Sequence, residues 1–189
     1  MDLEIKDLIN SSIKSLTPYE PGKPIEDLER EYGIKNAVKL ASNESPLGPS
    51  PKVLTTLEQV ISGIHRYPDG NGFRLKEALS SKHSVDMSVL TLGNGSNDII
   101  EFVARCFLRP KDNAIYSKYA FAVYPLIVKA LGAEGIEVEA KDWGHDLQAM
   151  LEAINKETKI VFIANPNNPT ATYLSALELK NLRKTHFQI

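Results

Sequence analysis

The sequence contains a single cysteine, Cys106, among its 189 residues. One cysteine cannot form a disulfide or a cysteine-based zinc site within the chain, which favours a reduced intracellular protein. No apolar run approaches the roughly 20 residues that cross a bilayer, and residues 1–7 alternate charged and apolar side chains without a signal-peptide core. A cytoplasmic protein with no membrane partner is therefore expected.

Neither sign of charge predominates, because 22 basic residues stand against 24 acidic ones and the net charge is −2. Without a basic patch, no nucleic-acid partner is expected. The histidines are isolated from one another and from carboxylate clusters, so no metal site is predicted and they are interpreted as surface or capping residues. They are His65, His83, His145 and His186. Cys106 shares the apolar side of a predicted helix with Phe102 and Val103 and is predicted to pack in the core.

The chain does have a regular alternation of short apolar segments and amphipathic segments. Strands are predicted at 38–40, 89–92, 114–116, 135–140 and 159–164. Helices are predicted at 3–16, 25–32, 51–62, 73–82, 99–108, 123–131, 147–154 and 175–184, the last with a Ser175–Glu178 capping box. The β-α-β repetition predicts an α/β fold with a mostly parallel sheet. A helix of an α/β fold normally leads back into the sheet, and here no strand is predicted after the last helix. The sequence is therefore expected to be truncated.

The segment Gly93-Asn94-Gly95-Ser96-Asn97-Asp98 lies between a predicted strand and a predicted helix. The start of a helix has free N–H groups and the positive end of the helix dipole, which suit a phosphate. The alternative is a plain turn in which Asn97 or Asp98 caps the helix. Asp98 stands where a dinucleotide fingerprint has its third glycine, and its carboxylate would repel a pyrophosphate, so a nucleotide-binding domain is disfavoured.

The segment Asn165-Pro166-Asn167-Asn168-Pro169-Thr170-Ala171 follows the most apolar predicted strand. Ligands bind at the carboxyl ends of strands in open α/β sheets, so amide side chains there favour a binding role. This segment resembles the N-P-T-G signature of fold-type I aminotransferases, which depend on pyridoxal 5′-phosphate. The resemblance implies that Asn168 binds the phenolic oxygen of that cofactor. It also implies that Gly95, Ser96 and Asn97 hold the phosphate and that Phe121 stacks on the ring.

Three upstream segments resemble the histidinol-phosphate aminotransferase family in their order. They are Pro18-Tyr19 with Pro21-Gly22, then Leu40 to Pro46, then Arg66-Tyr67-Pro68-Asp69. The resemblance implies that Tyr67 reaches the cofactor phosphate of a partner subunit in a homodimer, and that Tyr19 and Asn43 lie near the substrate. The implied reaction transfers an amino group between histidinol phosphate, or a similar amine, and the 2-oxo acid 2-oxoglutarate.

The resemblance implies an N-terminal arm with the start of a small domain over 1–50 and an incomplete cofactor-binding large domain over 51–189. Ala171 replaces the signature glycine, at a cost on the order of 1 kcal/mol if φ is positive there. No catalytic residue is assigned, because the chain ends before the family's Schiff-base lysine, its pyridine-binding aspartate and its carboxylate-binding arginine. A fragment inactive alone is therefore expected, and the alternative is a non-catalytic remnant that binds a phosphorylated ligand or a partner.

Overall fold

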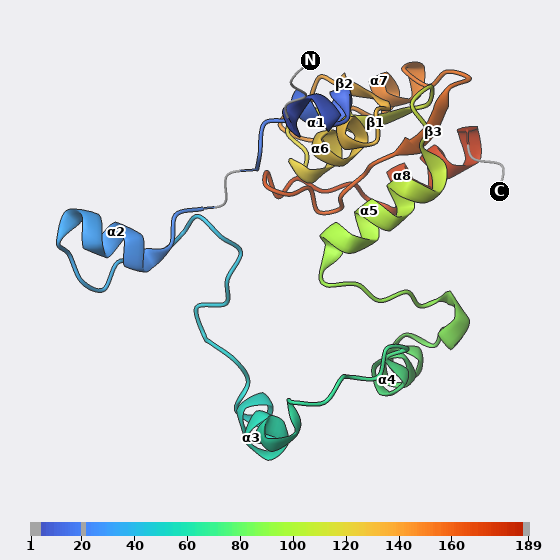
Figure 1. Cartoon of the computed structure of the whole chain (residues 1–189). Helices are drawn as coiled ribbons and strands as arrows, with labels where there is room; N and C mark the ends of the chain where they lie inside the picture. Colours follow the sequence, from blue (N-terminus) through green and yellow to red (C-terminus); the bar gives the residue numbers. More distant parts are fainter. Residues whose placement is uncertain (1–4, 20–21, 187–189) are drawn as a thin grey trace. The chain divides into compact units, whose positions relative to one another are not determined.

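The computed structural model describes residues 5–19 and 22–186 and divides the chain into two compact units (Figure 1). One unit joins Met1–Tyr19 to Gly93–Ile189, and the other is Glu20–Leu92. The two units are defined by which residues lie close together in space. The predicted domains, 1–50 and 51–189, are defined by family resemblance instead, so they stay a prediction. No helix in the described part of the chain is long and apolar enough to cross a membrane.

A parallel three-stranded sheet forms the centre of the first unit. Strand β1 (Asn113–Ser117) lies between β2 (Glu134–Val138) and β3 (Thr158–Val161), and both neighbours run parallel to it. All five residues of β1 are buried, as expected for a central strand covered on both faces. The predicted parallel α/β sheet is therefore confirmed.

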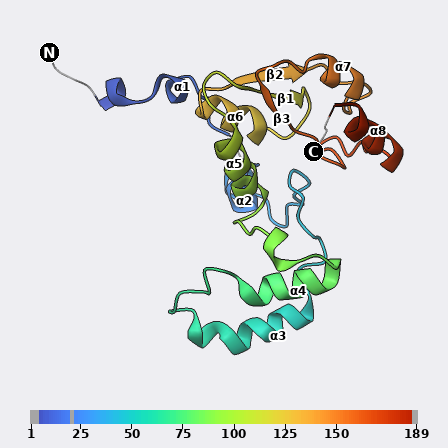
Figure 2. The same ribbon diagram turned by 90° about the vertical axis from the view of Figure 1, so that its right-hand side faces the viewer.

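Helices cover both faces of this sheet. Helices α5 (Ser96–Phe107) and α6 (Val123–Ala130) lie on one face, and α7 (Leu147–Glu152) lies on the other (Figure 2). Successive side chains of a strand point to opposite faces of the sheet, so each strand contributes apolar side chains to both layers. The face under α5 and α6 buries Ala104, Ala114, Tyr116, Tyr124, Val128 and Phe162. The face under α7 buries Ile115, Val138 and Met150, with Ile136 packed against this cluster.

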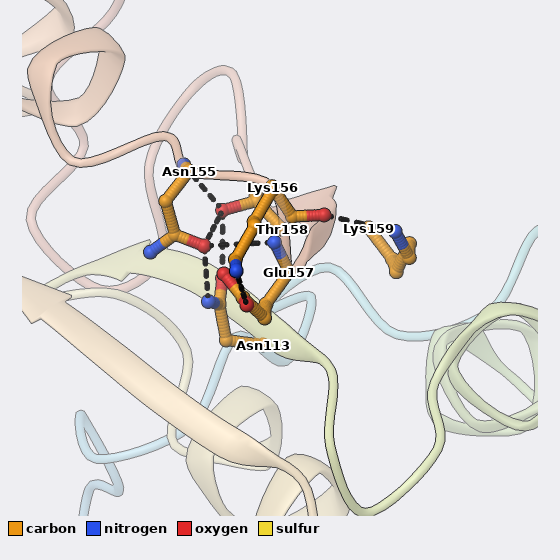
Figure 3. Close-up of polar contacts among 6 residues, drawn as sticks. All are labelled: Asn113, Asn155, Lys156, Glu157, Thr158 and Lys159. Carbon is orange, nitrogen blue, oxygen red and sulfur yellow. Dashed lines mark hydrogen bonds and ion pairs between the residues drawn. The ribbon is translucent and has the colours of Figure 1, made fainter.

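A buried polar network joins β1 to β3 where the two strands begin (Figure 3). The Asn113 side chain is 2% exposed; its Nδ2 donates to Asn155 Oδ1 at 2.9 Å, and its Oδ1 accepts from Thr158 Oγ1 at 2.8 Å. The Glu157 N–H also donates to Asn155 Oδ1, at 3.0 Å. Both polar ends of the buried Asn113 amide are therefore satisfied, which is what makes its burial tolerable.

The N-terminal segment packs on α6 but does not form the predicted single helix over 3–16. It forms a 3₁₀-helix, η1 (Ile5–Leu8), and a separate turn of helix, α1 (Ser11–Lys14). The side chain of Asn10 accepts from the Ser12 N–H at 3.2 Å and begins the second helix, so it interrupts the first. Residue Leu3 lies outside the described residues.

The unit Glu20–Leu92 contains helices α2 (Ile25–Tyr32), α3 (Pro51–Val60) and α4 (Phe73–His83), with 3₁₀-helices η2 (Ile61–Gly63) and η3 (Met87–Val89). The predicted end of α2 at Gly33 is confirmed, since Gly33 adopts φ 65°. The predicted strands at 38–40 and 89–92 are wrong. A strand needs a hydrogen-bonded neighbour, and neither segment has one among the described residues.

Helix α8 (Ala176–His186) begins with the predicted capping box. Ser175 Oγ accepts from the Glu178 N–H at 3.3 Å, and Glu178 Oε2 accepts from the Ser175 N–H at 2.8 Å. The Ser175 hydroxyl also donates to Glu178, and these hydrogen bonds hold the pKa of the Glu178 carboxyl below its usual value. The negative carboxylate also suits the positive end of the helix.

A consequence is that the capping box depends on pH in the acidic range. Because the folded pKa of Glu178 is lowered, its stabilising effect is present above the unfolded pKa and is lost as pH falls through the folded value. We expect the Ser175 amide resonance, followed by NMR, to titrate below the pKa of an ordinary glutamate. The variant Glu178→Gln removes the carboxylate, so the same titration in the variant would contradict the assignment.

Candidate functional site

Three loops leave the sheet at the same edge, because the parallel strands β1, β2 and β3 all end there. The loop after β1 carries Tyr119, the loop after β2 carries Trp143, and the loop after β3 carries Asn167. Side chains connect the loops: the Tyr119 and Trp143 rings make a tilted contact with centroids 4.9 Å apart, and Asn167 Nδ2 donates to the Tyr119 carbonyl at 3.0 Å. The edge is therefore one connected surface.

Helix α5 lies just before β1 in the chain, and the short connection 108–112 leads from its end into the start of β1. Ile100, in the first half of α5, packs against the same apolar cluster as Phe121 of the loop after β1. Gly95 precedes the helix with φ 80° and ψ −178°, and no side chain caps the first turn. The N–H groups of Ser96 and Asn97 lie in that first turn, where helices have no internal acceptors. This helix start is a cradle of main-chain donors at the positive end of the helix dipole.

Helix α5 begins at Ser96, three residues before the predicted start at Ile99. The alternative in which Asn97 or Asp98 caps the helix is wrong, because the N-cap residue is Gly95. Instead, Asp98 lies inside the first turn and its Oδ2 accepts from the Asn94 N–H at 2.8 Å. The carboxylate therefore binds the loop before the helix. Gly93 permits this fold-back, because a Cβ there would come within 2.8 Å of the Asp98 Cβ. Sequence spacing could not distinguish a cap from a fold-back.

Asn168 follows β3, and its side-chain amide makes no hydrogen bond within the described part of the chain. The neighbouring Asn167 is buried, and its main chain closes the loop. The Asn167 N–H donates to the Thr172 carbonyl, and the Ala171 N–H donates to the Asn167 carbonyl, both at 2.8 Å. The loop thus has a fixed backbone and one amide that is free to bind a ligand.

Phe121 lies in the loop after β1, just before α6, and is half-buried. Its ring meets the Tyr124 ring edge-on with centroids 6.0 Å apart, and Tyr124 stacks on Phe162 at 4.5 Å. A half-buried aromatic side chain in a T-shaped contact retains exposed ring surface that another flat ring can cover. The geometry is compatible with the predicted stacking role, which stays a prediction.

Ala171 adopts φ 59°, which is the left-handed region that the sequence analysis anticipated for the missing signature glycine. An alanine there costs on the order of 1 kcal/mol relative to glycine. We expect Ala171→Gly to stabilise the unit by up to about 1 kcal/mol, less the entropy that glycine gains when unfolded. Urea denaturation measures this. Ala133→Gly, at a buried position without positive φ, should destabilise the chain instead.

His145 and Cys106 contradict their sequence interpretations. His145 is buried rather than at the surface, and its Nε2 lies 3.0 Å from the Ala164 carbonyl just before the Asn168 loop. Cys106 is exposed rather than in the core, with Phe102 exposed beside it, because α5 buries the side that carries Ala104. Helical spacing showed an apolar side of α5 but not which residues the sheet would cover.

The predicted substrate residues, Tyr19 and Asn43, belong to different units, and the predicted cofactor residue Tyr67 belongs to the same unit as Asn43. Tyr19 lines a cavity of about 470 Å³ beside Arg105 of α5 and Leu126 of α6. Asn43 and Tyr67 are exposed residues of the unit Glu20–Leu92, and the Tyr67 side chain is fully accessible. Their contacts with substrate and with a partner subunit stay predictions. Among the described residues, no group of three or more histidine, cysteine or acidic side chains could hold a metal ion.

A second cavity, of about 1030 Å³, lies between the turn 141–148, the segment 171–174 and helix α8. It touches His145, Ala171 and Thr172 but none of the predicted cofactor residues. We place the candidate site at the α5 start and the Asn168 loop, because both have hydrogen-bond donors without a partner among the described residues.

Comparison with known proteins decides the family. The model of the family "Aminotransferase class I and II" matches residues 35–187. The chain belongs to this family. It is 55% identical over 173 residues to histidinol-phosphate aminotransferase 1 of Nitrosococcus oceani, covering 92% of the chain and 47% of that protein. It is 54% identical to histidinol-phosphate aminotransferase 2 of Pseudomonas aeruginosa, covering 89% and 46%. The chain therefore spans about half the length of these curated relatives.

Solved structures of family members share the fold. A histidinol-phosphate aminotransferase from Sinorhizobium meliloti, in complex with pyridoxal-5′-phosphate, superimposes with a TM-score of 0.83 at 26% identity. That match covers 93% of this chain and 47% of the other protein. Alanine aminotransferase from Pyrococcus furiosus, at 19% identity and a TM-score of 0.71, has the same fold. The predicted family and fold class are confirmed.

Proposed function

We propose that this chain supplies the cofactor-binding part of a pyridoxal-phosphate-dependent aminotransferase. Its proposed reaction moves an amino group between histidinol phosphate and 2-oxoglutarate. One observation supports the proposal: the unit built on the parallel sheet contains both a helix start without a side-chain cap and the Asn168 amide, which has no hydrogen-bond partner among the described residues. The relatives that cover most of the chain carry the name histidinol-phosphate aminotransferase, which supports the substrate pair.

The residues present fit the cofactor. Its phosphate is a dianion that the N–H groups of Ser96 and Asn97 would bind, since a helix start attracts negative charge. The free Asn168 amide would donate to the phenolic oxygen, and the half-buried Phe121 ring would cover one face of the pyridine ring. Asp98 does not oppose the phosphate in this arrangement, because its carboxylate is engaged by the Asn94 N–H.

When bound, pyridoxal phosphate supplies an electron sink for bonds at the α-carbon of an amine substrate. The contribution of this chain is to bind and orient that group: two main-chain donors fix one end, Asn168 fixes the ring oxygen, and Phe121 sets the plane. Tyr19 and Asn43 are proposed to position the amine and the 2-oxo acid. Tyr67 is proposed to complete the phosphate site of a partner subunit in a cytoplasmic homodimer.

The main-chain cradle can be tested by removing one donor without removing the helix. Proline is favoured at the first position of a helix, so Ser96→Pro deletes a single N–H group and keeps α5 intact. Binding is followed through the fluorescence of the only tryptophan, Trp143, during titration with pyridoxal 5′-phosphate. We expect weaker binding of pyridoxal phosphate and unchanged binding of pyridoxal, which lacks the phosphate. An equal loss of affinity for both ligands, or no loss for either, would contradict the proposal that these main-chain N–H groups bind the phosphate.

The substrate pair requires an activity assay. The 189-residue chain is assayed alone and joined after Lys180 to the second half of the Nitrosococcus oceani relative. Formation of glutamate from 2-oxoglutarate is measured with histidinol phosphate as donor, beside aspartate and aromatic amino acids. Preference for histidinol phosphate in the joined protein, weakened by Tyr19→Ala, supports the assignment, whereas preference for another donor would replace it.

The second candidate is a non-catalytic module that binds a phosphorylated ligand or a partner protein. The exposed apolar side chains of α5, Phe102 and Phe107, favour a partner. A soluble monomer with a cooperative melt, phosphate binding and no activity in the joined protein would favour this candidate. Binding of a nucleoside triphosphate in preference to pyridoxal phosphate would indicate the third reading, a nucleotide-binding domain.

A further inference from the structure

Asn167 is a buried asparagine beside the proposed cofactor residue Asn168, and the sequence analysis gave it no role. Its side chain is 3% exposed, and its Oδ1 has no hydrogen-bond partner in the described structure. A buried amide oxygen without a partner destabilises a fold, and an apolar residue of similar size would avoid that cost. Burial alone therefore does not explain an asparagine here, which directs attention to the atoms that its amide nitrogen binds.

The Asn167 amide nitrogen joins two loops that are distant in the sequence. It donates to the carbonyl of Tyr119 at 3.0 Å and to Thr170 Oγ1 at 2.7 Å. Tyr119 lies two residues before Phe121, and Thr170 lies two residues after Asn168. The same side chain thus reaches the loop that carries the proposed ring-stacking residue and the loop that carries the proposed amide donor.

We propose that Asn167 is a positioning residue that holds the Phe121 loop and the Asn168 loop at a fixed separation. Its two donated hydrogen bonds preorganise one ring-covering side chain and one amide around the same flat aromatic ligand. The ligand class rests on the proposed function, but the link between the loops does not. Preorganisation of this kind raises affinity because the loops lose no further freedom when the ligand binds.

The chain contains a reporter for the link itself. The Trp143 ring packs against the Tyr119 ring at a tilt of 35°, and the Trp143 carbonyl accepts from Thr172 Oγ1 at 3.5 Å, so this single tryptophan contacts both loops. If Asn167 is replaced, the Tyr119 loop is released and the ring should leave its partner. The emission of Trp143 should then shift to longer wavelength, and its quenching by acrylamide should increase, with no cofactor present.

Asn113 provides a matched control. It is an equally buried asparagine of the same unit, and it makes its hydrogen bonds where the strands begin, at the opposite end of the sheet. Asn113→Ala and Asn167→Ala should both lower stability to urea, because each leaves buried polar groups without partners. Only Asn167→Ala should alter Trp143 emission and weaken pyridoxal phosphate binding, by about tenfold for the loss of a buried hydrogen-bonded link.

Asn167→Asp tests donation separately from size, because aspartate has nearly the same shape but cannot donate when ionised. We expect Asn167→Asp to change Trp143 emission and cofactor affinity as Asn167→Ala does. If the alanine variant does not fold, the aspartate variant still tests whether Asn167 links the two loops. Unchanged Trp143 emission in the folded variant overturns the link, whatever the ligand does. If the wild-type chain binds no pyridoxal phosphate, the proposed function fails, and Trp143 emission still decides the role of Asn167.

Discussion

Replacing Gly95 with alanine is expected to weaken the binding of pyridoxal 5′-phosphate by about 10- to 100-fold. The reason is conformational, because Gly95 adopts φ 80° and ψ −178°, a region that side chains other than glycine rarely enter. Space is not limiting, since an added Cβ would meet nothing within 4 Å. The alanine variant must therefore change its backbone and turn the Ser96 and Asn97 N–H groups away from the phosphate.

Gly48 is a control that separates this local effect from a general loss of stability. It also has a positive φ, of 70°, and open space around the position of a Cβ, but it lies in the other unit. Gly48→Ala should cost stability while leaving the affinity of pyridoxal phosphate, measured through Trp143 fluorescence, unchanged. If Gly95→Ala bound the cofactor as tightly as the wild type, the phosphate site would have to be placed elsewhere.

Replacing Gly135 with alanine is expected to destabilise the chain by about 1–3 kcal/mol, the usual cost of overpacking a core. Gly135 pairs with Ala114 in the sheet, and a Cβ there would come within 2.3 Å of the Tyr116 hydroxyl oxygen. The tyrosine ring cannot move aside freely, because Tyr116 is buried in the cluster under α5 and α6. Burial also raises the pKa of the Tyr116 phenol, with a smaller contribution from the charge of Glu137.

A double-mutant cycle identifies the clashing atom. Tyr116→Phe alone should be nearly neutral, because no hydrogen bond of its hydroxyl is seen in the described structure. Combined with Gly135→Ala it should recover part of the lost stability, since the ring carbons would still approach to 3.0 Å. Urea denaturation monitors all four proteins. Full additivity of the two substitutions would show that the hydroxyl is not the obstacle.

Local patterns predicted the central architecture well, and the reason is physical. The strands at 114–116, 135–140 and 159–164 and the helices between them bury apolar residues against their neighbours, so their apolar patterns were visible in the sequence. Two other apolar segments, 38–40 and 89–92, have similar composition but no strand partner in the described structure. Composition expresses a preference for extended backbone, while pairing depends on residues far away in the chain.

The residues of the candidate site divide in the same way. Some are indicated by short motifs, and others depend on contacts with residues far away in the chain. Local motifs drew attention to the segments that carry Gly95, Ser96 and Asn168, because turn chemistry and helix starts are encoded within a few residues. The cofactor-binding roles that the family resemblance implies for these residues stay predictions. Asn167 and His145 were missed as structural residues, since their roles depend on the carbonyls of Tyr119 and Ala164, which are 48 and 19 positions away. A motif describes which groups face a ligand, but it does not describe what holds them in place.

The position of β1 has a consequence for the way this unit opens. The strand is hydrogen-bonded on both sides and all of its residues are buried, so solvent reaches its amides only when a neighbouring strand detaches. Deuterium should therefore enter β1 last, after the three edge loops and the N-terminal segment have exchanged. The edge loops could then adapt to a ligand on a short timescale while the hydrogen bonds of β1 stay intact.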